Sequence, residues 1–441
     1  MSDPTAPPGA GKAPAPSSGS QMGRRARRYA LVLIATVYVF NFIDRQILAI
    51  LLPAIKAEFG VADWVLGFLA GPAFAIFYVT LGIPIAVVAD RWNRRNLIAI
   101  SLTVWSAMTA LSGAAANIVQ LSMARIGVGI GEAGFAPPAH SMIADMYPPE
   151  RRSLAMGIFT LGISLGIMIA YLGGGWMAQN IGWRQALVIV GVPGLVLAAL
   201  FRATVTEPPR GMSDGRADRG ERFRVLDVAR YLLDRKSFVH MAVGAGLASF
   251  NAYAVLSFFP SFLERSHGLD LQQIGVYLGL IIGISTGIGF VGGGYIADKI
   301  GAKSQRLALW TMSAAMLLGW VFVFPLYLLT DPFVVIAVFF LPSLLNNMYL
   351  ATTFAQTQGL AGVRMRSVAS SLLLFVINVL GLGFGPLVAG WLSDWLAATS
   401  GSESLRYSLL IIGAVTGPWI AFHFYAAGRY IEPDLARVAV S

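Results

Sequence analysis

Four ionisable residues stand inside long apolar stretches of the sequence, Asp44 and Arg45 in one stretch and Arg125 and Glu132 in another. A charge near the centre of a bilayer costs at least about 2.5–3.5 kcal/mol on insertion scales, so such a residue normally has a partner and faces protein or water. The charges of the two acids and the two bases sum to zero, as a cluster whose charges compensate one another requires. An arginine between two carboxylates suits proton coupling, because protonating one acid frees the arginine for the other acid or for an anionic headgroup.

The spacing of these residues predicts how they meet. A helix that starts near residue 29 places Asp44 roughly 22 Å along its axis, and an oppositely directed helix from about residue 118 places Arg125 roughly 10 Å along. In a hydrocarbon core of about 30 Å these depths are similar. Glu132 lies two turns further on the same face as Arg125. We predict that Arg125 lies between Asp44 and Glu132 and can pair with either carboxylate, and that these three residues form the proton-coupling centre. The alternative is a permanent salt bridge that only holds the two helices together.

The remaining polar residues of the apolar stretches suggest a binding cavity. Arg45 follows Asp44 and points to another face, where we expect it to bind a phosphate or to act at an outer gate. The second half of the chain carries no acid or base that we expect to be buried inside its apolar stretches, and the polar residues there are neutral and accompanied by aromatic side chains. A cavity charged on one wall and amide- or aromatic-lined on the other suits an amphiphile. The residues expected to bind it are Asn41, Arg45, Asn251, Tyr253, Asn346, Asn347, Tyr349, Thr353, Phe354 and Asn378.

Composition places these residues in a membrane protein. Of the 441 residues 56% are hydrophobic and 12% are charged, against about 25% charged in ordinary soluble domains, and none is a cysteine. These values exclude a soluble globular enzyme, a disordered chain and a disulfide or thiolate–metal framework. Many apolar blocks exceed the roughly 20 residues that cross a bilayer as a helix. We therefore expect a polytopic all-α membrane protein.

No motif for catalysis or for a cofactor is present. The four histidines lie in four different segments, so no metal site is expected. No nucleophile–base pair or Walker-type loop occurs, so we expect neither an enzyme nor ATP-driven transport. The net charge of +10 could suggest nucleic acid binding. The basic residues, however, lie between the apolar blocks, which indicates membrane topology instead.

The apolar blocks and their breakers predict twelve membrane spans. These lie near 29–53, 64–89, 96–114, 118–144, 153–178, 185–204, 237–262, 272–297, 306–329, 332–360, 367–396 and 406–427. One long polar connector divides them into two sets of six. The expected organisation is a disordered N-terminal tail (1–28), a six-helix bundle (29–204), a linker (205–236), a second six-helix bundle (237–428) and a C-terminal tail (429–441).

The distribution of basic residues predicts the orientation. Most of the 32 lysines and arginines lie in the N-terminal tail, in the even-numbered loops and beyond the last span. The positive-inside rule therefore puts both termini and the 205–236 linker in the cytoplasm. We expect an integral multi-pass protein of a cell membrane or a bacterial inner membrane.

A short signature follows the second span of each half. The first copy reads Ala86-Val-Val-Ala-Asp90-Arg91-Trp-Asn93-Arg94-Arg95 and the second reads Gly294-Tyr-Ile-Ala-Asp298-Lys299-Ile-Gly301-Ala-Lys303. An acid at a helix end followed by bases can cap a neighbouring helix N-terminus and bridge to its first turn. We expect Asp90 to latch the cytoplasmic side by capping span 11, with Arg91 and Arg94 bridging nearby. The gating residues are expected to be Asp90, Arg91, Arg94, Asp298 and Lys299.

With these motifs the sequence resembles the major facilitator superfamily, from about residue 29 to 428. The first copy of the signature departs from that family's pattern, with Ala86 and Asn93 in place of glycines, whereas the second copy keeps Gly294 and Gly301. The chain looks most like the Spinster-like branch. The segments that carry this resemblance are Asn41-Phe-Ile-Asp44-Arg45, Arg125-Ile-Gly127-Val-Gly129-Ile-Gly131-Glu132 and Gly182-Trp183-Arg184.

The resemblance implies the major facilitator fold, with two six-helix bundles that move by alternating access. It also implies that spans 2 and 11, and spans 5 and 8, meet across the halves. The small-residue pairs expected on those surfaces are Gly67/Gly71, Gly162/Gly166, Gly279/Gly283/Gly287 and Gly381/Gly385.

Animal members of the branch are associated with lysophospholipid and sphingosine-1-phosphate export. We therefore expect a monomeric, proton-coupled secondary transporter, surrounded by membrane lipids, that moves an amphipathic lipid of lysolipid or sphingoid type. A proton-coupled multidrug or organic-anion exchanger is the alternative within that class. A transport-dead sensor or scaffold is the alternative of another class.

Overall fold

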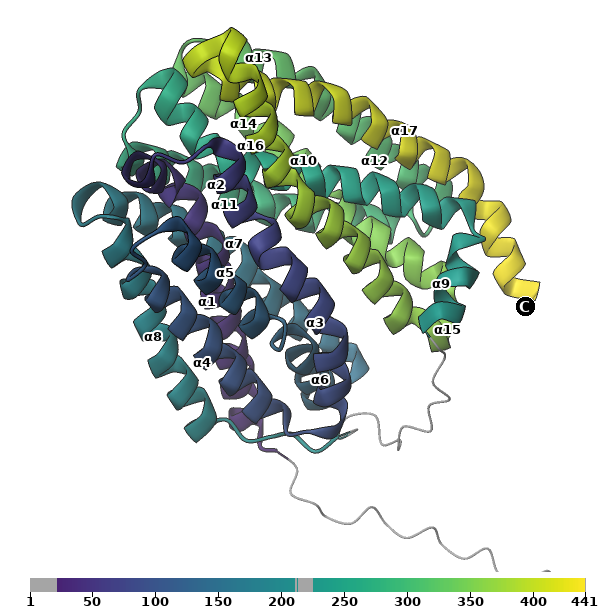
Figure 1. Ribbon diagram of the computed structural model, residues 1–441. Coiled ribbons are helices and arrows are strands. Elements are labelled where there is room, and N and C mark those ends of the chain that lie inside the picture. Colours follow the sequence, from purple (N-terminus) through teal and green to yellow (C-terminus); the bar gives the residue numbers. More distant parts are fainter. Residues whose placement is uncertain (1–21, 211, 213–224, 441) are drawn as a thin grey trace, which may run out of the picture.

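The computed structural model describes residues 22–210, 212 and 225–440, and every regular element in them is a helix. Figure 1 shows two helical bundles side by side, the first from purple to teal and the second from teal to yellow. The first bundle contains α1 (Arg24–Phe59), α2 (Asp63–Ala70), α3 (Pro72–Arg91), α4 (Arg94–Ser112), α5 (Ile118–Glu132), α6 (Ala136–Met146), α7 (Pro149–Asn180) and α8 (Trp183–Thr204). The second contains α10 (Lys236–His267), α11 (Leu271–Tyr295), η1 (Ile296–Ile300), α12 (Gln305–Val321), α13 (Val323–Leu328), α14 (Pro332–Asn347), α15 (Tyr349–Asn378), η2 (Val379–Phe384), α16 (Gly385–Ser400), η3 (Gly401–Glu403) and α17 (Ser404–Val440). The short helix α9 (Val225–Leu233) precedes it.

The helices are consistent with the twelve predicted spans. Nine stretches of the described chain are long and apolar enough to cross a membrane, and one of them, Val368–Arg437, contains two spans. The more polar α4 and the pair α5 and α6 complete the first bundle. Helix α15 contains a reversal, because the amide of Gln358 donates to the hydroxyl of Ser370 over 3.2 Å, whereas twelve residues of straight helix span about 18 Å. The all-α, two-bundle fold predicted from the sequence is confirmed.

Several predicted spans are broken helices. Span 2 is interrupted at Gly71, span 4 between α5 and α6, and span 10 at Met348. Proline follows the first break directly and stands at the start of α6 after the second, where a residue without an N–H cannot continue a helical ladder. At the chain ends the helices are longer than predicted. Helix α1 already begins at Arg24, and α17 continues to Val440 beyond the predicted end near 427.

Glycines set the closest approaches between helices, and they confirm part of the predicted pairing. A Cβ on Gly71 would lie 2.8 Å from the carbonyl oxygen of Leu382, so span 2 packs on span 11. A Cβ on Gly175 would lie 2.8 Å from the Cα of Gly275, so span 5 packs on span 8. The prediction for Gly162 was wrong, since its Cβ would lie 3.1 Å from main-chain and side-chain atoms of α1.

Of the other predicted glycines, some pack across the bundle interface as predicted and some pack within their own bundle. Gly166 packs on α1 beside Gly162, because both face the interior of the first bundle. Gly381 and Gly385 pack on α10 rather than on span 2. Gly279 and Gly283 pack on α7, as predicted.

The two ends of the molecule differ. The bundles approach each other at the end that holds α2, α13 and α16 and diverge at the end that holds α3, α6 and α15 (Figure 1). We call the first the distal end. The second is the proximal end, where α1 begins, α8 enters the linker and α17 ends. This arrangement leaves the middle of α1 and α5 between the end where the bundles approach each other and the end where they diverge.

Candidate functional site

Helices α1 and α5 hold the four charged residues close to the interface between the bundles. The side chains of Asp44, Arg125 and Glu132 belong to residues that are 2%, 3% and 1% exposed. The glycine-rich sequence of α5 brings that helix very near its neighbours. A Cβ on Gly131 would lie 2.6 Å from the main-chain nitrogen of Trp105 in α4, and Gly129 is equally tight against Phe74 in α3. This close packing fixes the last residue of α5, Glu132, at its depth.

Glu132 pairs with Arg45. The Nε of Arg45 donates to Oε2 of Glu132 over 2.5 Å. The guanidinium carbon lies 5.4, 5.0 and 4.4 Å from the ring centres of Phe42, Phe74 and Tyr78. The predicted pairing of Glu132 with Arg125 was wrong, because the long Arg45 side chain crosses from α1 to the end of α5. Arg45 is thus a partner within the charged cluster.

Arg125 and Asp44 are neighbours, as their similar predicted depths require, but their side chains are not paired. The Nη1 of Arg125 donates to the main-chain oxygen of Asp44 over 3.4 Å. Within the described residues no carboxylate lies within 4.0 Å of the Arg125 guanidinium, and its Nε has no hydrogen-bond partner. Oδ1 of Asp44 and Oε1 of Glu132 are also buried without partners. The cluster therefore contains one formed ion pair and three unmatched polar atoms.

A pocket between the two bundles reaches this cluster. The first bundle lines it with charged, polar and apolar side chains, and the second lines it with a tyrosine, a serine and a leucine. Its lining is Arg45, Gln46, Leu48, Ala49, Ala70, Phe74 and Arg125 with Tyr253, Ser257 and Leu382. Of the residues predicted to bind a substrate, Arg45 and Tyr253 thus share one pocket. A wall with two arginines faces a wall with hydroxyl groups and an aliphatic side chain.

Two of the other predicted binding residues lie in a different pocket. Asn251 and Asn346 line a space inside the second bundle, among residues of α12, α13, α14 and α17. Asn251 is two residues from Tyr253 on α10, which places the two side chains about 200° apart around the helix. One wall built from all the amides, as predicted from the sequence, is therefore not formed.

The remaining predicted binding residues mostly make contacts within their own bundle. Nδ2 of Asn347 donates to the main-chain oxygen of Ser343 over 2.8 Å, and Nδ2 of Asn378 donates to that of Leu374 over 2.9 Å. Tyr349 and Thr353 are buried, and Phe354 packs against the proximal core of the second bundle. Asn41, on α1, is buried with its Nδ2 unpaired.

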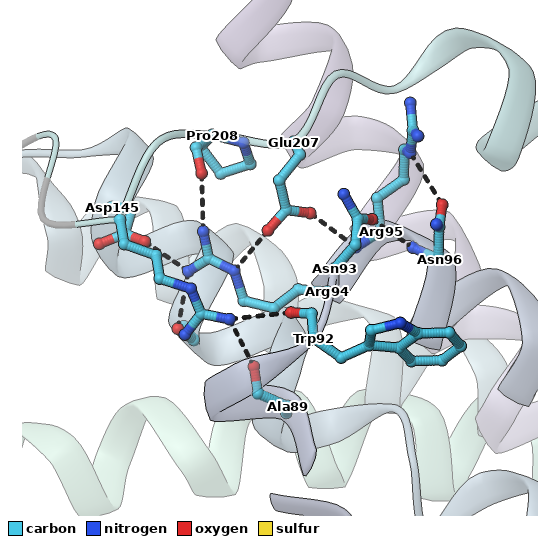
Figure 2. A network of polar contacts seen from close by, with 11 residues as sticks. Ala89, Trp92, Asn93, Arg94, Arg95, Asn96, Asp145, Glu207 and Pro208 are labelled. Atoms are coloured by element: carbon cyan, nitrogen blue, oxygen red, sulfur yellow. Dashed lines mark hydrogen bonds and ion pairs between the residues drawn. The ribbon is translucent and has the colours of Figure 1, made fainter. Parts of the chain in front are cut away.

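At the proximal end, Arg94 is tied into the first bundle. Its Nε donates to Glu207 over 2.8 Å, its Nη2 donates to the main-chain oxygen of Pro208 over 2.7 Å, and it forms an ion pair with Asp145 (Figure 2). Glu207 also accepts a hydrogen bond from the main-chain N–H of Arg95 over 2.8 Å. The expectation that Arg94 bridges near span 11 was wrong, because the start of the linker folds back onto the loop before α4 and supplies its partners.

The structure shows fewer contacts for the other predicted gating residues. The side chain of Asp90 lies outside the described residues, so its capping of span 11 stays a prediction. Arg91, Asp298 and Lys299 are exposed. In the described part of the chain none of these three forms an ion pair.

An ion pair joins the bundles at the distal end, and no pattern in the sequence indicates it. Asp63 of α2 accepts two hydrogen bonds from Arg265 of α10, over 2.7 and 2.8 Å. Lys56 donates to Asp63 over 2.5 Å, and the hydroxyl of Ser393 in α16 donates to it over 2.7 Å. In the sequence, charged residues at the ends of apolar blocks look like ordinary residues of the membrane interface. Asp63 and Arg265 differ from such residues only in lying opposite each other in the folded protein.

The same distal cluster contains a helix cap supplied by the other bundle. The carboxylate of Asp394 in α16 accepts hydrogen bonds from the main-chain N–H groups of Asp63 and Trp64, over 2.9 and 2.7 Å. The residue before α2 is Ala62, whose side chain cannot act as a cap. We call Lys56, Asp63, Arg265 and Asp394 the distal latch.

Comparisons with known proteins agree with this arrangement. The family model of the Major Facilitator Superfamily matches residues 34–386. An MFS-type efflux pump of Mycolicibacterium smegmatis is 33% identical over 416 residues, which cover 92% of this chain and 94% of that protein. Protein spinster homolog 1 of Xenopus laevis is 25% identical over 437 residues, 92% of this chain and 82% of that protein. A crystal structure of a bacterial homologue of the human lysosomal transporter Spinster, inward-facing and unoccupied, matches with a TM-score of 0.84 and 27% identity, covering 93% of this chain and 99% of that one.

Proposed function

Because this chain belongs to the Major Facilitator Superfamily and is a membrane transporter of the Spinster-like type, we propose that it moves an amphipathic, lipid-like molecule by proton-coupled alternating access. The observation that carries the proposal is the buried charged cluster of α1 and α5, beside the pocket between the bundles. It holds an Arg45–Glu132 ion pair together with Asp44 and Arg125, whose charged groups form no ion pair with each other and each keep one buried atom, Oδ1 and Nε, without a partner. Buried charges at such depth are expensive unless they serve a path for ions or substrate.

Asp44 is the proposed proton acceptor. Its Oδ1 is buried without a hydrogen-bond partner, and no cation lies within 4.0 Å of its carboxylate in the described chain. A proton on Asp44 would leave the cluster with one net positive charge, on Arg125 beside the pocket. That charge attracts an anionic headgroup, so proton uptake and substrate binding favour each other. Release of the proton would weaken the hold on the headgroup.

The orientation of the transporter in the membrane follows from the difference between the two ends of the molecule. We propose that the proximal end is cytoplasmic, with both termini and the 205–236 linker on that side, in a cell membrane or a bacterial inner membrane. The distal latch joins the bundles in this structure, and we propose that the substrate reaches the pocket from the proximal end. Likeness to an inward-facing crystal structure supports this assignment. A single copy contains both bundles and the whole pocket, which supports a monomeric transporter.

An amphipathic substrate fits the walls of the pocket. Arg45 and Arg125 offer charge to a headgroup, and Leu48, Phe74 and Leu382 offer apolar surface to a chain. A second candidate is export of drugs or organic anions, favoured by the 33% identity to an MFS-type efflux pump. The two candidates share the charged cluster and differ in whether the substrate needs a long apolar tail.

Reconstituted transport separates these candidates. Proteoliposomes under an imposed pH gradient are offered a lysophospholipid, sphingosine-1-phosphate, a short-chain organic anion and a cationic dye. Proton-driven movement of the two lipids, lost in Asp44→Asn and kept in the exposed α9 control Asp227→Asn, supports the proposal. Movement of only the organic anion or the dye favours the exchanger. If nothing moves while the protein is folded, a sensor or scaffold remains, and if Asp44→Asn retains the wild-type pH dependence, Asp44 does not couple protons.

A further inference from the structure

Two histidines meet on the outside of the second bundle, away from the pocket. Nδ1 of His240 in α10 and Nδ1 of His423 in α17 lie 3.0 Å apart. A Cβ on Gly244, one turn along α10, would lie 3.2 Å from the Cβ of His423, so the two helices are in close contact here. Both imidazoles are partly exposed. The transport cycle proposed above uses neither of them.

The contact fixes the protonation states that the pair can adopt. One Nδ1 must donate and the other must accept, so at most one of the two carries a proton on that atom. In the neutral pair, one Nε2 is therefore an acceptor and the other is a donor. Uptake of one proton keeps the contact and turns both Nε2 atoms into donors, with one positive charge shared between the rings. A second proton would put two N–H groups face to face and break the contact.

Both Nε2 atoms are accessible at the surface. Neither forms a hydrogen bond with the described residues, and neither is among the buried unpaired atoms. Exposed rings border the pair, since Tyr430 stacks on His240 at 5.9 Å and Phe422 and Trp419 lie within 5.5 and 6.3 Å of His423. Rings with an apolar body and a polar edge are typical of the level of lipid headgroups.

Charged groups of both signs lie at this corner of the second bundle. Lys236 begins α10, and its Nζ lies 5.4 Å from the ring centre of Tyr430 in α17. An acid at this corner, Asp434 of α17, accepts hydrogen bonds from the N–H and the hydroxyl of Ser237 and lies 3.9 Å from Arg437. Asp234, in the turn before α10, is exposed. Within the described chain no carboxylate lies within 4.0 Å of Lys236, His240 or His423.

The depth of the pair fits the boundary between headgroups and acyl chains. His240 is four residues after Lys236, so it lies about 6 Å along α10 from the proximal helix end. We propose that His240, His423 and Lys236 form a binding site for the phosphate of an anionic phospholipid in the leaflet at the proximal end, and that one proton on the imidazole pair strengthens this binding. The lipid would bridge α10 and α17.

The test measures lipid binding and needs no transported substrate, so its outcome is independent of the proposed transport function. The purified protein is titrated with phosphatidylglycerol or phosphatidylcholine in mixed micelles, at about pH 5.5 and about pH 8, on either side of the ordinary histidine pKa of about 6.5. The lipid retained per protein is counted by native mass spectrometry. One extra charge near a headgroup predicts phosphatidylglycerol binding about fivefold tighter at the lower pH, with little change for phosphatidylcholine.

Variants decide between this site and general surface charge. The double variant His240→Gln, His423→Gln is expected to lose the fivefold pH effect, whereas His267→Gln at the opposite end of α10 keeps it. Lys236→Gln is expected to weaken binding similarly at both pH values. The proposal is overturned if the double variant retains the pH effect, if phosphatidylcholine binds as well as phosphatidylglycerol, or if inorganic phosphate alone displaces the lipid at equal concentration.

Discussion

Replacing Asp63 with asparagine removes the centre of the distal latch while keeping nearly the same shape. The amide of the Asp63→Asn variant would no longer carry the charge that pairs with Arg265 and Lys56 across 2.5–2.8 Å. The bonds to Arg265 join the two bundles, and they exist only while the distal end is closed. Their loss therefore changes the balance between distal-closed and distal-open states more than the stability of either bundle.

The size of that change follows from burial. Breaking a fully buried ion pair costs about 3–5 kcal/mol, whereas an exposed pair contributes about 0–1 kcal/mol. The Asp63 side chain is 3% exposed, but those of Arg265 and Lys56 are 19% and 33% exposed, so the latch lies between these limits. We expect about 2 kcal/mol, which is roughly a thirtyfold shift toward the distal-open state.

Distance measurements by electron spin resonance test this shift. The chain has no cysteine of its own, so spin labels on cysteines at the exposed positions Ala116 and Ser402, one on each bundle, report only the distal opening. The matched control is Glu403→Gln, because Glu403 bonds Arg406 and Ser266 within the second bundle and should leave the distances as in wild type. If Asp63→Asn gives the same distance distribution as Glu403→Gln, the latch does not hold the halves together.

Three further changes test other parts of the structure. Arg94→Ala leaves the partly exposed carboxylates of Glu207 and Asp145 without their buried partner and should lower stability by about 2 kcal/mol, seen as a lower thermal midpoint. An unchanged midpoint would contradict the tight docking of the linker. Gly175→Leu forces a side chain against Gly275, which should destabilise the molecule or hold it in one conformation, at a cost of about 1–3 kcal/mol. The same spin-label distances and an unfolding measurement test this effect. Wild-type behaviour would contradict the close approach of the two glycines. Arg45→Lys keeps the charge but loses the planar group that stacks among three rings, so transport should fall at least about tenfold in a folded protein; full activity would show that charge alone suffices.

The sequence was informative wherever burial alone constrains a residue. The cost of charge in a bilayer singled out Asp44, Arg45, Arg125 and Glu132. The structure places all four in one cluster on α1 and α5, and two of them, Arg45 and Arg125, line the pocket between the bundles. Helical rise predicted that Asp44 and Arg125 are neighbours, and they are. It could not predict which guanidinium reaches Glu132, because a long side chain can cross between helices in several rotamers.

Other features depend on contacts between segments far apart in the chain. Asp63 and Arg265 each stand at the end of an apolar block, where charges are ordinary, and only the packing of the two bundles brings them together. The prediction that the amide side chains of the second half form one wall of a cavity was wrong for a related reason. Asn251 and Tyr253 are close in sequence but face opposite sides of α10, so composition alone assigned them to one cavity.

The cap that Asp394 supplies to α2 makes the secondary structure of one bundle depend on the other. Helix α2 has only eight residues and is separated from α3 by Gly71, so little else holds its first turn. When the bundles part at the distal end, the N–H groups of Asp63 and Trp64 lose their acceptors and exchange with solvent. Fraying of that turn would then accompany each opening, and the hydrogen-exchange rates of two amide protons would report the fraction of time that the molecule spends in each half of its cycle.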